Sequence, residues 1–477
     1  MENFSTSYEK NVNLVTEKLR PEMNYDIIIK KIVIGSKKAT LFCITGFIKD
    51  EMFDMTMQYL TKITKGEMEK ATDAYSFLRH FTTYVSSVAE ENVGIFITAV
   101  LSGAIGILIE GYRKGIIIDC RSYPARNVQE PESDKVLRGS HEGFVESIVV
   151  NTALIRKKVR STELTMERVT VGSESKTDVV LCYMNNRVNK KHLKILQNKL
   201  NSIRVKALPM SHESLRECLI PEQVWNPFPK IRYTERPDAA AACVYDGNII
   251  IITDGSPTVM IAPTGIFDFI QDINDYYFSP IIGSLLRFIR VAVFTASLMF
   301  IPLWYLFVIL YKENLPDYLM FMAIEEEYTV PVIVQLFIVE FVIDALRLAS
   351  LNTPSALSSS FSVVAALVLG EFAVKSGWFV SEVVLFMAFV TISNFVQPSY
   401  ELGHSVKIFR TVILFLTALL QGWGLLLGTA ITVLVISFTK TVFGYTYLYP
   451  LIPFDSDAFK KLILRRSINF KERSPRQ

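Results

Sequence analysis

The sequence is poor in the residues that build metal centres and disulfide frameworks. Its 477 residues include five cysteines and five histidines. The cysteines are odd in number, scattered and free of any C-x-x-C spacing, so we expect reduced thiols rather than a disulfide framework or a zinc site. The histidines show no metal-ligand spacing, and we expect neither a bound metal nor a cofactor. These residues are Cys43, Cys120, Cys182, Cys218 and Cys243, and His80, His141, His192, His212 and His404.

The short motifs of common enzymes are also absent. The sequence contains no G-x-x-x-x-G-K-[ST], no G-x-G-x-x-G after a strand, no H-E-x-x-H and no G-x-S-x-G. Acid–base pairs can be assembled from almost any soluble domain, but nothing here singles one pair out. We therefore expect no catalytic residues and no enzyme activity. The formal net charge of +3 is close to neutral, so nothing argues for a nucleic-acid partner.

The N-terminus lacks the features of a secretory signal. Its first 22 residues are polar and mixed in charge, with no apolar core. We therefore expect the N-terminal region to stay in the cytoplasm.

Charge is distributed unevenly along the chain. Hydrophobic residues make up 50% of the sequence and the mean hydropathy is +0.30. Charged residues recur every few positions up to about Arg290, whereas long uncharged runs dominate from Val291 to Ile452. This shift predicts an α/β cytoplasmic N-terminal region of two subdomains, followed by an all-α polytopic transmembrane domain. The expected boundaries are a lead-in over 1–24, subdomains over 25–127 and 128–285, the transmembrane domain over 286–452 and a basic cytoplasmic tail over 453–477.

In the first subdomain, two β-rich runs around Gly35 predict a hairpin. Residues 50–91 lack proline and carry apolar residues at helical spacing, which predicts two helices. Residues 93–109 form an uncharged run of 17 residues, near the lower limit for a membrane span. Because Gly103 and Gly106 interrupt this run, we expect a buried strand or hairpin there, with a membrane helix as the alternative.

The second subdomain shows a mixed pattern of helices and strands. Residues 139–160 predict an amphipathic helix with a basic C-terminal end. Residues 177–184 read as a strand and residues 189–203 as a helix. Residues 246–263 predict two short strands around the turn dipeptide Asp254–Gly255.

The C-terminal half contains four clear candidate membrane spans. The first is 21 uncharged residues flanked by basic residues, with Pro302 expected to kink it. The second is unusual, because it carries three charged residues within an apolar helix. The spans are Val291–Tyr311, about Thr329 to Leu351, about Ala356 to Val374 and about Trp378 to Val396.

A further uncharged run of 29 residues, from Thr411 to Thr439, is too long for one span. As a helix it would be about 43 Å long, against a hydrocarbon core of about 30 Å. Gly422 and Gly424 offer a helix break. The tail from Lys460 holds seven Lys or Arg residues, which places it on the cytoplasmic side. We therefore expect a helical hairpin or a re-entrant pair, and whether residues 411–450 span twice or re-enter stays open.

Charged residues within the predicted spans are the strongest functional signal. Glu340, Asp344 and Arg347 fall on one helical face, and Glu371 lies in the third span. Such residues usually face protein or water and often mark an ion path, and acidic rings in an oligomer select cations. The alternatives are an interhelical salt bridge, such as Arg347 with Glu371, or an interfacial helix. Glu382 lies close to a helix end and is expected at the interface.

Several stretches together resemble one family. They resemble, in order and spacing, the A-type receptor subunits of the GerA spore germination family. Within that family the C-terminal segments are most similar to the stage V sporulation protein AF branch. The stretches are residues 130–160, the TERPD run at 234–238, DGSPTVMIAPT at 254–264, LGEFAVKSGW at 369–378 and QPSYELGHSVKIFR at 397–410.

The resemblance implies a multi-pass protein of the bacterial spore inner membrane, with both termini in the spore core. It also implies a homo-oligomer that forms a gated cation channel, promotes or amplifies ion release during germination, and works with other germination membrane proteins. The family offers no catalytic residues to transfer.

Two other functions remain open. The first is a non-conducting membrane scaffold that docks other germination or dipicolinate-release proteins through its cytoplasmic domain. The second is a secondary transporter, for which we find no inverted repeats in the two membrane halves. The lipid bilayer is an expected partner in every case. The basic tail could bind anionic headgroups, although as a topology determinant it needs no further role.

Overall fold

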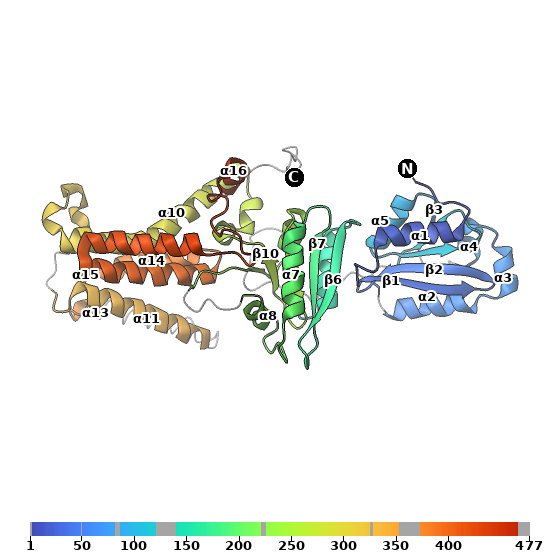
Figure 1. Ribbon diagram of the computed structural model, residues 1–477, viewed down its shortest axis with the longest axis horizontal. Helices are drawn as coiled ribbons and strands as arrows, with labels where there is room; N and C mark the ends of the chain where they lie inside the picture. The colour runs from blue at the N-terminus through green and yellow to red at the C-terminus, as the bar shows by residue number, and fades with distance from the viewer. Residues whose placement is uncertain are drawn as a thin grey trace. The chain divides into compact units, whose positions relative to one another are not determined.

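The computed structural model describes residues 2–48, 50–81, 86–120, 140–220, 226–324, 328–352 and 373–465. The chain divides into an α/β unit and a helical unit, which confirms the predicted order of the two (Figure 1). The helical unit begins at Thr264, ahead of the expected boundary at residue 286, and also takes in residues 223–230. The α/β unit comprises Met1–Glu222 and Ile231–Pro263, and the helical unit comprises Gln223–Lys230 and Thr264–Gln477.

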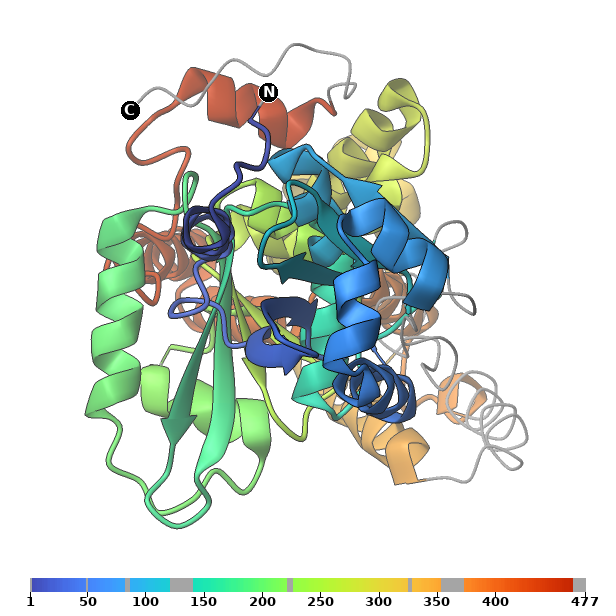
Figure 2. The ribbon, with the colours of Figure 1, turned by 90° about the vertical axis from the view of Figure 1, so that its right-hand side faces the viewer.

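The first subdomain is an antiparallel sheet of five strands in the order β1-β2-β4-β5-β3. The predicted hairpin is present, with Gly35 at φ 61° in its turn. Helices pack on both faces of this sheet, which is drawn in blue and seen nearly along its strands in Figure 2. The strands are β1 (Ile27–Ile34), β2 (Lys37–Ile44), β3 (Ser87–Glu90), β4 (Ile105–Ile109) and β5 (Gly115–Ile118). The helices are α1 (Tyr8–Leu19), α2 (Asp50–Lys62), α3 (Lys65–Lys70), α4 (Ala74–Phe81) and α5 (Val93–Leu101).

Two predictions for this subdomain were wrong in part. Residues 50–91 form three helices and a strand instead of two helices, because a capping box at Thr64 and Glu67 starts a separate helix. Residues 93–109 begin with α5, which Asn92 caps, and only their second half is a strand. A continuous apolar run does not distinguish a buried helix from a buried strand.

The second subdomain is another antiparallel five-stranded sheet, in the order β6-β7-β9-β10-β8. Its two predicted strands around Asp254–Gly255 are β9 and β10. One face of the sheet forms a core with α6 and α9. The strands are β6 (Leu164–Val171), β7 (Thr177–Met184), β8 (Arg232–Thr234), β9 (Ile249–Thr253) and β10 (Val259–Ala262). The helices are α6 (Ile148–Lys158), α7 (Lys190–Ser202), α8 (Ser211–Leu219) and α9 (Pro237–Tyr245).

The two subdomains repeat one fold. Each runs helix, hairpin, helices, strand, helix and a second hairpin, and the strand orders correspond position by position. At the start of α1, Asn11 accepts a hydrogen bond from the N–H of Ser5 at 2.9 Å and donates to its C=O at 2.8 Å. Asn151 of α6 makes the same two bonds with Val145. A shared F-x-x-S-x-x-x-N pattern at 4–11 and 144–151 is the sequence trace of this duplication.

Helix α6 lies between the subdomains. The helix predicted within 139–160 is present with its basic C-terminal end, but it is not amphipathic. It is shorter than predicted and is buried on most sides. The buried Arg156 guanidinium donates to both carboxylate oxygens of Asp26, at 2.9 and 3.0 Å. The Tyr25 hydroxyl bonds the Thr152 hydroxyl at 2.7 Å, and burial raises the pKa of Tyr25 to about 12. A helix that packs on both sides has no solvent face to reveal its period.

We expect Asp26→Asn to destabilise this subdomain contact by about 3–5 kcal/mol, because it leaves the Arg156 charge buried without its counter-ion. Urea unfolding of the detergent-solubilised chain, with hydrogen exchange of α6 and β1, measures the loss. The matched control is Glu174→Gln, which removes an exposed pair with Lys206 (3.3 Å) and should cost less than about 1 kcal/mol. Equal losses in the two variants would contradict the assignment.

The first long helix of the helical unit is α10, whose regular turns end at a π-helical segment just after Pro302. Proline has no N–H to complete the helical ladder, and the hydrogen-bond pattern changes within the turn that follows it. The kink itself remains a prediction. The elements are η1 (Ile266–Phe269), η2 (Ile273–Tyr276), α10 (Pro280–Trp304), η3 (Tyr305–Leu310), η4 (Lys312–Asn314), η5 (Asp317–Met322), α11 (Val332–Asn352), α13 (Ala373–Lys375), α14 (Ser381–Val396), α15 (Tyr400–Phe438) and α16 (Ser456–Ile463).

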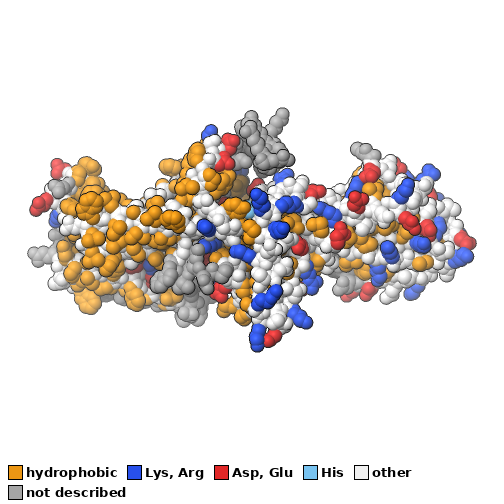
Figure 3. Space-filling model, in the orientation of Figure 1, with side chains coloured by type: hydrophobic (Ala, Val, Ile, Leu, Met, Phe, Trp, Pro, Cys, Tyr) orange, Lys and Arg blue, Asp and Glu red, His pale blue; other side chains and the backbone are white. Residues whose placement is uncertain are grey.

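Two helices in the described part of the chain are long and apolar enough to cross a membrane, Pro280–Leu310 and Tyr400–Phe438. Hydrophobic side chains gather over the surface of α10, α14 and α15, whereas charged side chains are spread over the α/β unit (Figure 3). The predicted third span lies almost wholly outside the described residues, so four spans remain a prediction.

A short strap, residues 226–230, belongs to the helical unit although it precedes β8 in the chain. The Phe228 ring stacks on the Phe409 ring of α15 at 5.1 Å and 14°. The Tyr447 hydroxyl donates to the Pro229 carbonyl at 2.6 Å. Burial raises the pKa of Tyr447, which keeps its hydroxyl protonated for this bond.

Candidate functional site

The two carboxylates of α11 are paired with two cations of α15. One nitrogen of Arg410 (Nη2) donates to both Glu340 oxygens, at 2.6 and 2.8 Å. Lys407 forms an ion pair with Asp344 and lies 3.5 Å from Glu340 Oε1. We call these four residues the α11–α15 network. It holds two positive and two negative charges, which relieves the repulsion between carboxylates one helical turn apart.

The side chains of the α11–α15 network differ in solvent exposure, and one of them also contacts a third helix. The Arg410 side chain is 3% exposed, that of Glu340 18% and that of Asp344 35%. Arg410 Nη1 also donates to the Ser297 carbonyl of α10 at 3.4 Å. Asp344 is therefore the carboxylate that is most accessible from outside the helical unit.

The other predicted charges lie elsewhere or outside the described residues. The Arg347 guanidinium lies over the rings of Phe395 and Tyr400, at 5.1 and 5.4 Å from their centroids. Glu371 falls outside the described residues, and with it the suggested Arg347–Glu371 pair. Glu382 lies in the first turn of α14, and one of its carboxylate oxygens is buried without a hydrogen-bond partner among the described residues.

Sequence reasoning did not include Lys407 and Arg410 among the candidate site residues. In the structure both lie within α15, on its first arm. Lys407 and Arg410 are three positions apart, and Glu340 and Asp344 are four positions apart, so each pair lies on one face of its helix. A search for oppositely charged pairs on different helices could therefore have found them.

Helix α15 reverses direction at Gln421, whose φ of 53° and ψ of −131° are not helical. This is one residue before Gly422, where the sequence predicts the break. A Cβ on Gly424 would collide with the Leu416 carbonyl oxygen, and one on Gly428 would lie 2.9 Å from Ile413 Cα. The two arms therefore run antiparallel in close contact, as in a helical hairpin.

We expect Gly424→Ala to destabilise the hairpin by about 1–3 kcal/mol, because the added methyl forces the arms apart. Thermal unfolding of the detergent-solubilised chain measures the effect. Gly422→Ala is the matched control, since its Cβ would meet nothing closer than the Tyr311 hydroxyl at 4.0 Å. A loss in both variants, or in neither, would mean that the close approach at Gly424 does not hold the hairpin.

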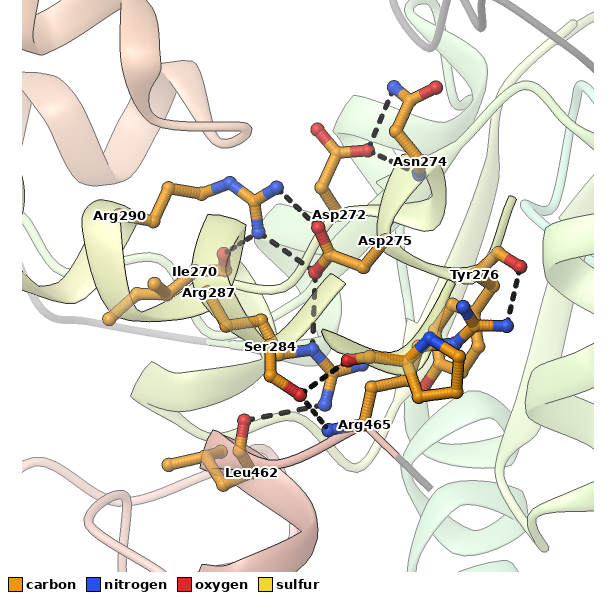
Figure 4. Close-up of polar contacts among 11 residues, drawn as sticks. Ile270, Asp272, Asn274, Asp275, Tyr276, Ser284, Arg287, Arg290, Leu462 and Arg465 are labelled. Carbon is orange, nitrogen blue, oxygen red and sulfur yellow. Dashed lines mark hydrogen bonds and ion pairs between the residues drawn. The ribbon is translucent and has the colours of Figure 1, made fainter. Parts of the chain in front are cut away.

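A second cluster lies at the start of α10 (Figure 4). Asp275 is fully buried, and Arg290 donates to its two oxygens at 2.6 and 2.9 Å. Arg287 Nε donates to the same carboxylate at 3.2 Å. These two arginines are among the basic residues that flank the first predicted span, and the structure buries both against Asp275. We call Asp275, Tyr276, Arg287, Arg290 and Arg465 the α10 arginine cluster.

Reactive side chains of the α/β unit have structural surroundings. Burial raises the pKa of Cys182 to about 12, which keeps this thiol protonated. Ser256 contacts His212 Nδ1 at 2.7 Å, but it is buried and donates to the Thr258 carbonyl within its turn. Within the described ranges, no three His, Cys, Asp or Glu side chains gather in a group that could hold a metal ion.

Comparison with known proteins identifies the family. A profile described as "Bacillus/Clostridium GerA spore germination protein" matches residues 14–477. Stage V sporulation protein AF of Bacillus subtilis (strain 168) is 35% identical over 460 residues, which cover 96% of this chain and 92% of that protein. Spore germination protein KA of the same organism is 27% identical over 95% of this chain and 84% of that protein.

Among solved structures, the N-terminal domain of the A subunit of the Bacillus megaterium spore germinant receptor GerK3 matches with a TM-score of 0.42 and 24% identity. The match covers 55% of this chain and 96% of that one. The family match spans nearly the whole chain and confirms the resemblance that the sequence motifs indicate. This chain belongs to the GerA family of spore germination proteins.

Proposed function

We propose that this chain is a membrane subunit of a spore germination complex, and that an oligomer of it forms a gated cation path. Family membership supports the role in germination, and the two long apolar helices support a membrane location. The proposal includes a multi-pass arrangement in the spore inner membrane, both termini in the core, and other germination membrane proteins as partners. The α11–α15 network is the observation that carries the cation path.

Charge in an apolar helix is costly and therefore informative. An ionisable residue near the bilayer centre costs at least about 2.5 kcal/mol on insertion scales. Helix α11 carries Glu340 and Asp344 on one face, with Asp344 35% exposed. Repeated around the axis of an oligomer, these carboxylates would form acidic rings, which favour cations over anions. Asp344 would be the first carboxylate that an entering cation meets.

The same network supplies a closed state. Lys407 and Arg410 compensate both carboxylates, so a cation gains little by approaching them. Conduction then requires the first arm of α15 to withdraw its two cations from α11. In this proposal α15 is the gating element, and the ion pairs are the contacts that break.

The alternative hypothesis, a non-conducting membrane scaffold, has one observation in its favour. The network is balanced in charge, so it also serves as a clamp between α11 and α15 that needs no ion. The two α/β subdomains would then provide the docking surface for other germination or dipicolinate-release proteins. In that case the charges matter for assembly and not for flux.

Substitutions of opposite charge distinguish the two readings. We expect Glu340→Gln with Asp344→Asn to slow potassium efflux from germinating spores severalfold, because the cation loses its ligands. Lys407→Gln should instead speed efflux, because Asp344 loses its clamp. Potassium release is measured in spores that carry each variant as their only copy of the protein, and an immunoblot establishes equal abundance.

The opposite signs guard against a folding defect, which would lower efflux in every variant. Glu382→Gln is the control, since it removes a carboxylate of α14 outside the network and should leave efflux unchanged. If both network variants release potassium like the wild type, or change in the same direction at equal abundance, the cation path is wrong and the scaffold reading takes its place.

A further inference from the structure

The α10 arginine cluster contains more positive charge than its own carboxylate neutralises. It contains three guanidinium groups and one carboxylate, that of Asp275, whose two oxygens already accept bonds from Arg287 and Arg290. Arg465 does not share this carboxylate in the described contacts. It lies just beyond α16, which packs against α10.

Arg465 is held in place by contacts that leave part of its guanidinium group without a partner. Its backbone N–H donates to Ser284 Oγ at 3.0 Å, and its Nη2 donates to the Tyr276 carbonyl at 2.8 Å (Figure 4). Its guanidinium also lies 5.8 Å from the Tyr276 ring centroid. Its Nε and Nη1 atoms are buried and have no hydrogen-bond partner among the described residues.

The backbone makes room for this side chain. A Cβ on Gly283 would lie 2.9 Å from Arg465 Cδ and 2.5 Å from the Asp275 carbonyl oxygen. The backbone at Gly283 therefore accommodates the Arg465 side chain closely, which distinguishes this contact from the chance contact of a surface arginine. Buried donors of a charged group without acceptors are unfavourable, so the site calls for an anion.

The surroundings indicate where that anion comes from. Exposed apolar side chains border the cluster on α10 and after α16, including Ile281 at 83% exposed and Phe288 at 63%. Leu464, next to Arg465, is also exposed. Basic groups beside an exposed apolar surface at the end of a membrane helix match the headgroup region of a bilayer, where acyl chains cover the apolar side chains.

We propose that the α10 arginine cluster binds the phosphate of an anionic phospholipid headgroup, with the free Nε and Nη1 donors of Arg465 as its principal contacts. The Arg287 guanidinium lies 5.2 Å from the centroid of the same Tyr276 ring and adds positive charge there. Free phosphate offers the same oxygens, but the apolar border favours a lipid. This site is separate from the α11–α15 network and stands whether or not the chain conducts ions.

The test is lipid binding by the full chain in neutral detergent micelles. Phosphatidylglycerol, phosphatidylcholine or inorganic phosphate is titrated in, and the apparent melting temperature is followed with native mass spectrometry of the bound lipid. Phosphatidylglycerol should stabilise the protein, and the other two should not. Arg465→Gln should weaken phosphatidylglycerol binding about tenfold, because the free donors and their charge are lost.

Two further variants keep the test sharp. Lys460→Gln removes an exposed cation of α16 outside the cluster and should bind as the wild type does. Arg465→Lys keeps the charge but loses the planar fork, and should fall between the wild type and Arg465→Gln. Each variant is first shown to elute and melt normally without lipid.

Three results would overturn the proposal. The first is wild-type affinity in a correctly folded Arg465→Gln protein. The second is an equal loss in Lys460→Gln, which would reduce the effect to general charge attraction. The third is stabilisation by inorganic phosphate as strong as that by phosphatidylglycerol, which would make this a site for soluble anions.

Discussion

The cost of removing a charge from water is the constraint on which this structure depends. Three largely buried ion pairs among the described residues illustrate it, and they join residues 130, 15 and 70 positions apart in the chain. They are Arg156 with Asp26, Arg290 with Asp275 and Arg410 with Glu340. Apolar packing gives helices in lipid little preference for one arrangement, because lipid tails are as apolar as the side chains. In either unit, each pair favours the arrangement in which its two elements meet, because an alternative arrangement would leave a charge without its partner.

Helix α10 connects the two charged sites of the helical unit. Its first turns carry Arg287 and Arg290 of the arginine cluster, and two turns later the Ser297 carbonyl accepts a bond from Arg410. The Gln397 side chain, between α14 and α15, donates to the Arg290 carbonyl at 3.4 Å. A shift of α10 along its axis would therefore change both sites, which makes this helix a direct physical connection between the α10 arginine cluster and the α11–α15 network.

Local sequence patterns predicted those helices, strands and turns that are determined by neighbouring residues. The first hairpin and the strands around Asp254–Gly255 follow from turn residues and side-chain period, and two long apolar helices follow from the length of their uncharged runs. The identity of α5 did not, since a uniformly apolar run has no period to read. The partners of Glu340 and Asp344 were also missed, because residues 70 positions apart carry no local signal of contact. The duplicated fold left short shared patterns, such as the Phe, Ser and Asn at 4–11 and 144–151, which are too short for a repeat to be recognised.

The strap sets the order in which this protein can be completed. Its contacts reach Ser405, Thr439 and Tyr447, which follow it in the chain by 178, 213 and 218 residues. At a synthesis rate of 5–20 residues per second, the ribosome needs about 10 to 40 seconds to produce those partners after the strap has emerged. During that interval the Phe228 ring has no stacking partner and is open to water or to chaperones. Docking of the strap is therefore a late step in biogenesis, and it can occur only after the C-terminal hairpin has been made.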